Sequence, residues 1–203
     1  MARPYESPLR REQAAATRRQ ILQAAQRLFE RQGYAATTIA QIAAEAGVSV
    51  KTVYVAFDTK SGVLRELWNS LVNGEPGRWY EDAIEGSDPA ERLRTTAHDA
   101  RVVKAIAGRV LWVIRTAAPA DPDISALWQR IETEFRDALR PIVETIAADG
   151  ALRPDLDVDE ATDILWTLVH PDIGRLLVDV RGWKPARYEL WCAETALAQL
   201  LGS

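Results

Sequence analysis

The segment VKTVYVAF, which begins at Val50, carries side chains whose types and spacing suit contacts with nucleic-acid bases. At helical spacing, Val53 and Phe57 share one apolar face and point inward. The side chains left facing outward are Val50, Lys51, Thr52 and Tyr54. Lys51 can donate to guanine acceptors, and Thr52 can bond a base or a phosphate. The methyl groups of Val50 or Thr52 can pack on a thymine methyl. The alternative for Tyr54 is a half-buried packing role.

The elements around this segment would hold it as the second helix of a pair. The stretch TTIAQIAAEAG predicts a helix capped by Thr37 or Thr38 and ended by Gly47, after which Ser49 can cap the next helix. A longer helix over residues 13–32 precedes the pair and ends at Gly33. Two short helices joined by a tight glycine turn are typical of a helix-turn-helix motif.

The rest of the chain also predicts helices, with no alternating strand pattern longer than a few residues. A fourth helix begins near residue 60. The expected later helices cover residues 89–107, 110–117, 122–148, 158–180 with a break at Pro171, and 185–201. His170-Pro171-Asp172 can form a new helix start, because proline suits the first helical position and an acid suits the first turn. The predicted fold class is all-α.

The segment from Arg18 to Leu64 resembles the DNA-binding domain of the TetR (tetracycline-repressor-like) family. The resemblance rests on RRQILQAAQRLFERQGY, TTIAQIAAEAGVS, KTVYVAF and DTKSGVL. It implies that Tyr54, Lys60 and Thr38 hold the DNA backbone, which fixes register more than sequence. The family usually has an aromatic residue or His where this chain has Ala56, so we expect one fewer backbone contact per subunit.

Basic residues are concentrated in the N-terminal third of the chain. Residues 1–72 hold ten Lys/Arg and six Asp/Glu, a net charge of +4, whereas the whole chain has −4 and the remainder therefore −8. This asymmetry suits one end that meets a polyanion, although ordinary variation in surface charge is the alternative. The cations that could add phosphate or minor-groove contacts are Arg18 and Arg19, and Arg3, Arg10 and Arg11 in the arm.

The C-terminal stretch that ends in LWCAETALAQLL has a looser resemblance to one TetR-type C-terminal subfamily, which implies an effector-binding and dimerising domain. The last helix carries more apolar surface than one face needs, and a two-fold dimer would cover the excess. The expected interface residues are Leu190, Trp191, Thr195 and Leu197. The alternative is that this surface packs within one chain.

Tryptophans supply the candidates for an effector pocket. The chain has seven, nearly all C-terminal to the helix-turn-helix, and aromatic residues commonly line apolar ligand pockets. The expected lining residues are Trp112, Trp128, Trp166 and, as a polar anchor, His170. The alternatives are core packing for each tryptophan and a helix cap for His170. Such a pocket would suit an apolar or aromatic molecule.

Catalytic and metal-binding patterns are absent from the sequence, so we expect no enzyme, no cofactor and no metal site. It has no Gly-rich phosphate loop, GxSxG, HExxH or paired Cys, and its two His and one Cys lack ligand spacing. We expect Cys192 to be a small buried residue. The chain has no apolar run that could serve as a signal or a membrane span, which predicts a cytoplasmic location.

These observations predict a flexible basic arm over residues 1–13, a three-helix helix-turn-helix domain over 14–58, and a larger ligand-binding and dimerisation domain over 59–203. The expected function is a homodimeric transcriptional regulator that binds double-stranded operator DNA and is released by a small molecule. A repressor is the expected sign. An activator, or a helical interaction protein that never binds DNA, remains the alternative.

Overall fold

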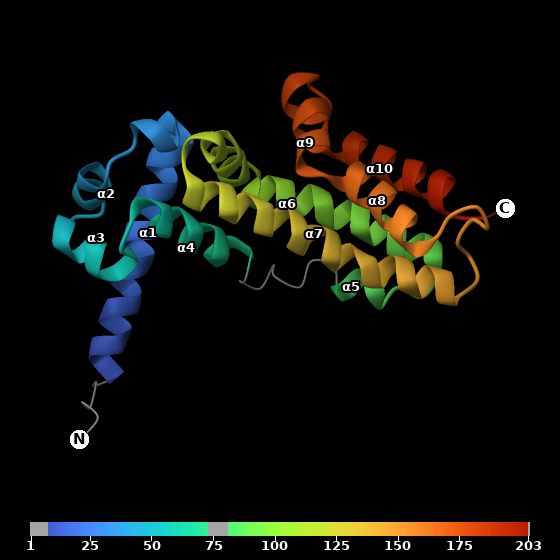
Figure 1. Cartoon of the computed structure of the whole chain (residues 1–203), viewed down its shortest axis with the longest axis horizontal. Helices are drawn as coiled ribbons and strands as arrows, with labels where there is room; N and C mark the ends of the chain where they lie inside the picture. Colours follow the sequence, from blue (N-terminus) through green and yellow to red (C-terminus); the bar gives the residue numbers. More distant parts are fainter. Residues whose placement is uncertain (1–7, 73–80, 203) are drawn as a thin grey trace. The chain divides into compact units, whose positions relative to one another are not determined.

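The computed structural model describes residues 8–72 and 81–202, and their regular elements are helices (Figure 1). The only β-type pairing among these residues is an isolated bridge between Leu152 and Leu201, so the predicted all-α class is confirmed. The helices are α1 (Pro8–Ala36), α2 (Ile39–Glu45), α3 (Val50–Phe57), α4 (Lys60–Val72), α5 (Glu81–Ile84), α6 (Pro89–Ala117), α7 (Pro122–Ala148), α8 (Val158–Val169), α9 (Pro171–Gly174) and α10 (Pro185–Leu200). A short 3₁₀ segment, η2 (Ala118–Ala120), follows α6, and a π-helical segment, η3 (Arg175–Val180), follows α9.

The chain divides into two compact units. The first contains the residues up to Ser70 together with Val110–Leu127, and the second contains Leu71–Arg109 and Trp128–Ser203. This division differs from the expected boundary at residue 58. The first unit also takes in most of α4, the end of α6 and the start of α7, because side chains of α1 and α4 bond to the start of α7.

The helix α1 has the buried face that its apolar spacing predicted. Its inward residues, all at most 3% exposed, are Ile21, Ala24, Ala25, Leu28 and Phe29. Gly33 adopts a positive φ of 78°, which glycine tolerates without strain, and α1 bends there before one last turn. The described helix begins at Pro8, although residues 8–13 were expected to be part of a flexible arm. Proline suits a first helical position, and the following LRREQAAA are good helix formers.

Local capping explains why α2 and α3 are short and well defined. The Thr38 hydroxyl accepts from the Gln41 backbone N–H, and the Gln41 side chain accepts from the Thr38 N–H, which completes a capping box. Gly47, with φ 66°, makes the turn, and the Ser49 hydroxyl accepts from the Thr52 N–H at 3.0 Å. Val53 and Phe57 are buried, as their spacing predicted.

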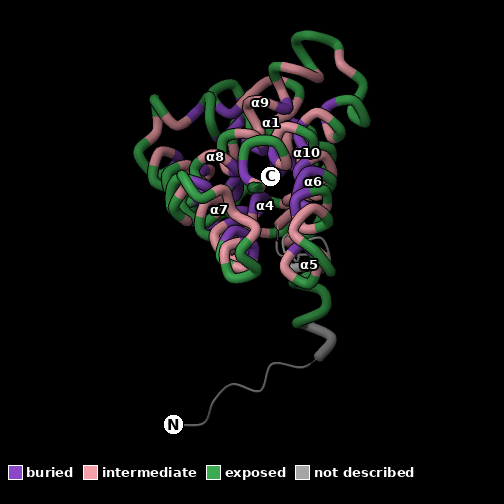
Figure 2. Tube along the Cα trace, turned by 90° about the vertical axis from the view of Figure 1, so that its right-hand side faces the viewer, coloured by how far each residue is buried: buried purple, intermediate pink, exposed green. Residues whose placement is uncertain are grey.

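The second unit has its core where α6, α7, α8 and α10 face one another, with their buried residues in purple in Figure 2. Large fully buried members include Leu93, Leu139, Ile142, Ile146 and Leu165. Cys192 is also buried, and its thiol donates to the Leu168 carbonyl at 3.4 Å. The side chain is 0% exposed, which confirms the predicted small buried residue, and this burial raises the pKa of the thiol to about 11.

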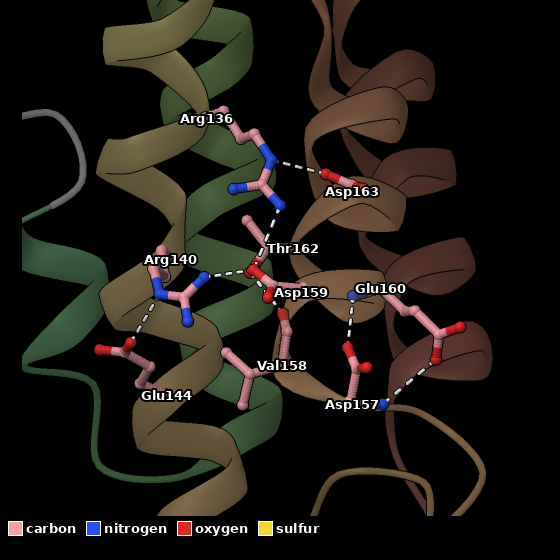
Figure 3. Close-up of polar contacts among 9 residues, drawn as sticks. All are labelled: Arg136, Arg140, Glu144, Asp157, Val158, Asp159, Glu160, Thr162 and Asp163. Atoms are coloured by element: carbon pink, nitrogen blue, oxygen red, sulfur yellow. Dashed lines mark hydrogen bonds and ion pairs between the residues drawn. The ribbon is translucent and has the colours of Figure 1, made fainter.

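Ion pairs connect the outer sides of α7 and α8 (Figure 3). Arg136 donates to Asp163 at 2.6 Å and to Asp159 at 3.4 Å, and Arg140 donates to Asp159 and, at 2.8 Å, to Glu144. Asp157 begins α8 by accepting from the Glu160 N–H at 2.8 Å. The arginines of this surface therefore have their anionic partners within the same unit.

Glycine and proline have different effects on the later helices. We expected separate helices over 89–107 and 110–117, but α6 continues through Gly108, and the two-helix prediction is wrong. One internal glycine costs only about 1 kcal/mol, and Ala107, Val110 and Ile114 are buried on both sides of it. The break at Pro171 is confirmed: the His170 ring Nδ1 accepts from the Asp172 N–H at 3.2 Å, which caps α9. None of the described helices is long and apolar enough to cross a membrane.

Candidate nucleic-acid interface

The outward face of α3 is the candidate interface. Val50 is 42% exposed and Tyr54 is 51% exposed, and Lys51 is also exposed with no hydrogen-bond or ion-pair partner in the part of the chain that the structure describes. Thr52 is only partly exposed, and its hydroxyl shares a hydrogen bond of 2.8 Å with that of Ser49. The helix thus presents one unpaired cation and several apolar surfaces to solvent.

Val55 belongs to this face, although it was not among the outward residues predicted from the sequence. Its side chain is 80% exposed, the highest value among the large hydrophobic residues that the structure describes as exposed. The helical repeat could have revealed it, because Val55 follows Lys51 by four residues and therefore lies on the same side of α3. A valine in an apolar run is easily mistaken for a core residue.

Arg18 makes contacts inside the first unit. Its guanidinium donates to the Ala56 carbonyl at the end of α3 and, at 3.1 Å, to the Glu66 carboxylate on α4. It also lies 4.4 Å from the centroid of the Phe57 ring, which is a cation–π distance. The structure therefore gives Arg18 the role of joining three helices, and a DNA contact by this residue stays a prediction.

Lys60 is likewise held by backbone groups. Its ammonium donates to the carbonyls of Tyr34 at 2.9 Å and Thr37 at 3.0 Å, and it lies 4.1 Å from the centroid of the Tyr34 ring. Burial lowers the pKa of Lys60, while the nearby Asp121 carboxylate acts in the opposite direction. Thr38 is exposed, but its hydroxyl is bonded to Gln41 in the capping box. DNA-backbone contacts by Lys60 and Thr38 stay predictions.

The start of α7 is bonded to the helix-turn-helix within the first unit. The Tyr34 hydroxyl donates to Asp121 at 2.7 Å, and the Ser61 hydroxyl donates to Asp123 at 2.9 Å. Burial and the bond to Asp121 raise the pKa of Tyr34, so this hydroxyl keeps its proton. Asp121 also accepts from the Asp123 N–H at 3.0 Å, so it caps α7 while it holds α1.

Backbone geometry fixes the end of α3. Asp58 has a φ of 64°, an uncommon value for a residue other than glycine, and its N–H donates to the Tyr54 carbonyl at 2.8 Å. A Cβ added to Gly62 would lie 2.1 Å from the Phe57 carbonyl oxygen, so only glycine lets α4 approach α3 this closely. The orientation of α3 thus depends on Gly62, Asp58 and Arg18.

The remaining predicted cations divide into two groups. Arg19 and Arg11 are exposed along α1, and neither has a partner among the residues that the structure describes. Arg10 is in the first turn of α1, and Arg3 lies outside the described residues. Arg19 therefore remains available for a phosphate contact in a way that its neighbour Arg18 is not.

The predicted effector-pocket residues do not all belong to one unit. Trp166 and His170 are together: their rings are 4.8 Å apart in an edge-on arrangement, and Phe135 lies 6.2 Å from His170. The Trp166 indole N–H is buried and has no hydrogen-bond partner among the described residues. Trp128 is a partly buried residue of the same unit, whereas Trp112, 42% exposed, belongs to the first unit.

The predicted dimer residues lie along α10 with different exposures. Leu190 is 58% exposed, while Trp191 packs edge-on against Trp183 with ring centroids 6.2 Å apart. The Thr195 hydroxyl donates to the Trp191 carbonyl at 2.7 Å, and Leu197 is partly buried against the core of the second unit. Leu190 is thus the interface candidate that has the least packing within its own chain.

Comparisons with known proteins agree with the geometry of the first unit. Residues 21–67 match the family model of bacterial regulatory proteins, tetR family. The chain is 28% identical to the probable HTH-type transcriptional regulator ArpR of Pseudomonas putida, over 85% of this chain and 90% of that protein. It is also 28% identical to the HTH-type transcriptional repressor KstR2 of Rhodococcus jostii, over 75% of this chain and 78% of that protein.

Solved structures share the fold over nearly the whole chain. A transcriptional regulator from Saccharomonospora viridis, solved in complex with choline, has a TM-score of 0.77 at 23% identity and covers 93% of this chain and 100% of its own. The helix-turn-helix match, which includes the capped α2–α3 pair, and the likeness to regulators along most of the chain lead to one assignment. Residues 21–67 carry the DNA-binding domain of the tetR family of bacterial regulatory proteins, and curated HTH-type regulators are similar to this chain over most of its length.

Proposed function

We propose that this protein is a homodimeric transcriptional repressor that binds a palindromic operator through α3 and is released by a small molecule. The observation that carries the proposal is the outward face of α3, where Lys51, Tyr54 and Val50 are exposed. Their partners lie outside the described chain, and a major groove offers base edges and phosphates that fit them.

The contacts within this interface have different purposes. Lys51, at the start of α3, is placed to donate to guanine acceptors, since the first residues of a recognition helix meet base edges. Tyr54, one turn further on, and Arg19 on α1 are the residues we assign to phosphates. Phosphate contacts give affinity for any sequence, whereas base contacts distinguish one sequence from another.

Selection from a pool of random duplexes at near-physiological salt tests the proposal. We expect the protein to recover a palindrome whose half-site centres are about 34–36 Å apart, one turn of DNA. Lys51→Ala should change the preferred bases, and Tyr54→Ala should weaken binding to operator and random DNA alike. Recovery of nothing above background would contradict DNA reading and favour the interaction protein. Equal losses on operator and random DNA for Lys51→Ala would contradict only its base contact.

A second copy of the chain is the partner we assign to α10. Leu190 exposes 58% of an apolar side chain there, and two-fold symmetry would place it against the same helix of the other copy. Leu190→Glu should yield monomers in sizing with light scattering and weaken operator binding, while Arg187→Glu introduces the same side chain elsewhere on α10 as the control. A variant that stays dimeric would remove Leu190 from the interface.

An apolar or aromatic effector is proposed to bind near Trp166. The buried indole N–H without a described partner, beside His170 and Phe135, supports the site, because a ligand acceptor would satisfy that donor. To shift the protein from 99% to 1% in the DNA-binding conformation, the effector must bind the released conformation more tightly by about 5.5 kcal/mol. We expect aromatic ligands that release the operator to quench tryptophan fluorescence, and less so in Trp166→Phe. Ligand release with unchanged quenching in this variant would place the effector elsewhere.

Repression is the proposed sign, and the likeness to KstR2, named as a repressor, supports it. A reporter gene under the selected operator should be silenced by the protein and restored by the effector. Increased expression with the protein present would instead identify an activator. The proposed location is the cytoplasm, where operator DNA is found in a bacterial cell.

A further inference from the structure

Val55 is the most exposed apolar side chain on a helix that has little polar chemistry. Of the eight large hydrophobic side chains exposed in the described residues, three lie on the eight-residue α3: Val50, Tyr54 and Val55. Single exposed hydrophobic residues are ordinary on protein surfaces, but several on one short helix indicate an interaction face.

The helical repeat places Val55 at the centre of the side of α3 that is turned away from the core, with Tyr54 about 100° and Val50 about 140° from it around the axis. Successive residues turn by about 100° around the axis, so Val55 lies about 180° from the midpoint between the buried Val53 and Phe57. Lys51 is about 40° to one side and Thr52 about 60° to the other. Val55 therefore points straight away from the core, in the direction from which a docked surface would approach.

The chemistry of α3 limits what this face can recognise. Its only cation is Lys51, it has no acid and no amide side chain, and the Thr52 hydroxyl is shared with Ser49 at 2.8 Å. Apart from Lys51 and Thr52, the Tyr54 hydroxyl is the remaining polar side-chain group of α3, so apolar contacts make up a large part of what this helix can offer. In the major groove the apolar group among the base edges is the 5-methyl of thymine, which packs against aliphatic side chains.

From this arrangement we propose that Val55 reads a thymine 5-methyl group in each half-site of the operator. The inference rests on the proposed function, and it adds a specificity residue and a base to it. When the operator binds, the Val55 isopropyl group loses water and contacts the thymine methyl. Packing within the protein gives this exposed side chain no such apolar contact. Lys51 then supplies the polar reading and Val55 the apolar reading on the same face.

Uracil substitution in the operator gives a direct test, since deoxyuridine pairs like thymidine but lacks the methyl. With the operator from the duplex selection, each thymine is replaced in turn and the Kd is measured for wild type and for Val55→Ala. At one position per half-site, wild type should bind roughly fourfold more weakly, the effect of about one methyl group removed from a buried contact. Val55→Ala should bind the thymine operator about as weakly and be insensitive to uracil at that position.

Two further variants keep the outcome clear. Val180→Ala, which truncates an exposed valine of η3 in the second unit, should keep the wild-type affinity and the full uracil penalty. Val55→Ile should retain the penalty, because it keeps a branched aliphatic side chain. If wild type tolerates uracil everywhere, or if Val55→Ala keeps the whole penalty, the inference is wrong although DNA reading stands. If no sequence is selected, the proposed function fails and the inference fails with it.

Discussion

Two surfaces of the molecule differ in whether their cations are paired. One is formed by α7 and α8, and the other is the outward face of α3. On the first, Arg136 and Arg140 are paired with Asp159 and Asp163 in the same unit (Figure 3). On the second, Lys51 has no acidic partner in the described chain. The difference indicates that a paired surface has little left to offer a polyanion, whereas an unpaired one keeps its charge for a partner outside.

The same distinction separates two neighbouring arginines of α1. Arg18 is bonded to Ala56 and Glu66, and Arg19 is exposed without a described partner. Both were expected to approach DNA because both are basic residues of the same region. Basic character in the sequence is therefore not enough to assign a phosphate contact, because tertiary partners can use the charge first.

The largest effect should come from Arg18→Ala. The variant leaves the Ala56 carbonyl without its charged donor and removes the cation above the Phe57 ring. We expect the free energy of unfolding to fall by about 2 kcal/mol, measured by denaturant titration.

Arg19→Ala is the matched control for this prediction. It should leave the free energy of unfolding unchanged. It should also reduce the slope of log Kd against log salt by about one, because each arginine that neutralises a phosphate releases about one counterion. If Arg19→Ala destabilises the protein as much as Arg18→Ala does, the contrast between the two arginines disappears.

A smaller effect is expected for Tyr34→Phe, which removes the hydrogen bond of 2.7 Å to Asp121 and keeps the ring above which Lys60 lies. Asp121 is then without one partner in a partly buried position, so the stability of the protein should fall by about 1.5 kcal/mol. Thermal unfolding measures it, with Tyr54→Phe on the exposed α3 as the control. An unchanged Tm would show that this bond contributes nothing to holding α7.

Asp99 is a carboxylate of the second unit, and one of its oxygens is buried without a partner among the described residues. It extends the comparison of paired and unpaired charges from cations to an anion. Burial raises its pKa to about 7, the nearby Asp82 adds to the rise, and His98 opposes it. Folding therefore disfavours the charged form, so the destabilisation is absent below about pH 4 and grows until about pH 7.

Asp99→Asn should accordingly stabilise the protein at pH 8 by about 1 kcal/mol, a discounted value because the group is only half buried, and should have no such effect at pH 4. Urea unfolding across this pH range measures the difference, and the exposed Asp137→Asn is the control. A stabilisation that does not depend on pH would mean that Asp99 is not the titrating group.

The smallest effect is expected for Arg136→Ala. Its pairs with Asp163 and Asp159 are solvent-exposed, and exposed pairs contribute between about 0 and 1 kcal/mol. We expect a change in unfolding free energy below about 0.5 kcal/mol and no change in the salt slope of operator binding. A reduced slope would show that this arginine reaches DNA, which would end the distinction between the two surfaces.

The sequence predicted the elements whose signals are local. Thr38, Gly47 and Ser49 mark the ends of α2 and α3 by capping and turn chemistry, and Val53 and Phe57 show the inward face by their spacing. The helix-turn-helix followed from these few residues, and the all-α class followed from helical spacing along the rest of the chain. The break expected near Gly108 was wrong because that prediction used only a local signal, the glycine, and not the buried residues on both sides of it.

Contacts between residues far apart in the chain could not be predicted. Arg18 meets Glu66 across 48 positions, and Tyr34 meets Asp121 across 87, and no spacing rule connects such pairs. These contacts decide which cations remain available, so the sequence could propose a candidate interface but could not show which of its cations have partners within the protein. Val55 was missed for a different reason, because residue type was given more weight than helical position.

The way α3 is anchored has a consequence for engineering. Its end is held through the Ala56 carbonyl by Arg18 and by the close approach of Gly62 to the Phe57 carbonyl, so these anchors use backbone atoms of α3. The side chains at positions 50, 51, 54 and 55 take no part in this anchoring. A combinatorial library that varies these four positions and keeps Arg18, Gly62, Val53 and Phe57 should therefore yield folded proteins retargeted to new operators.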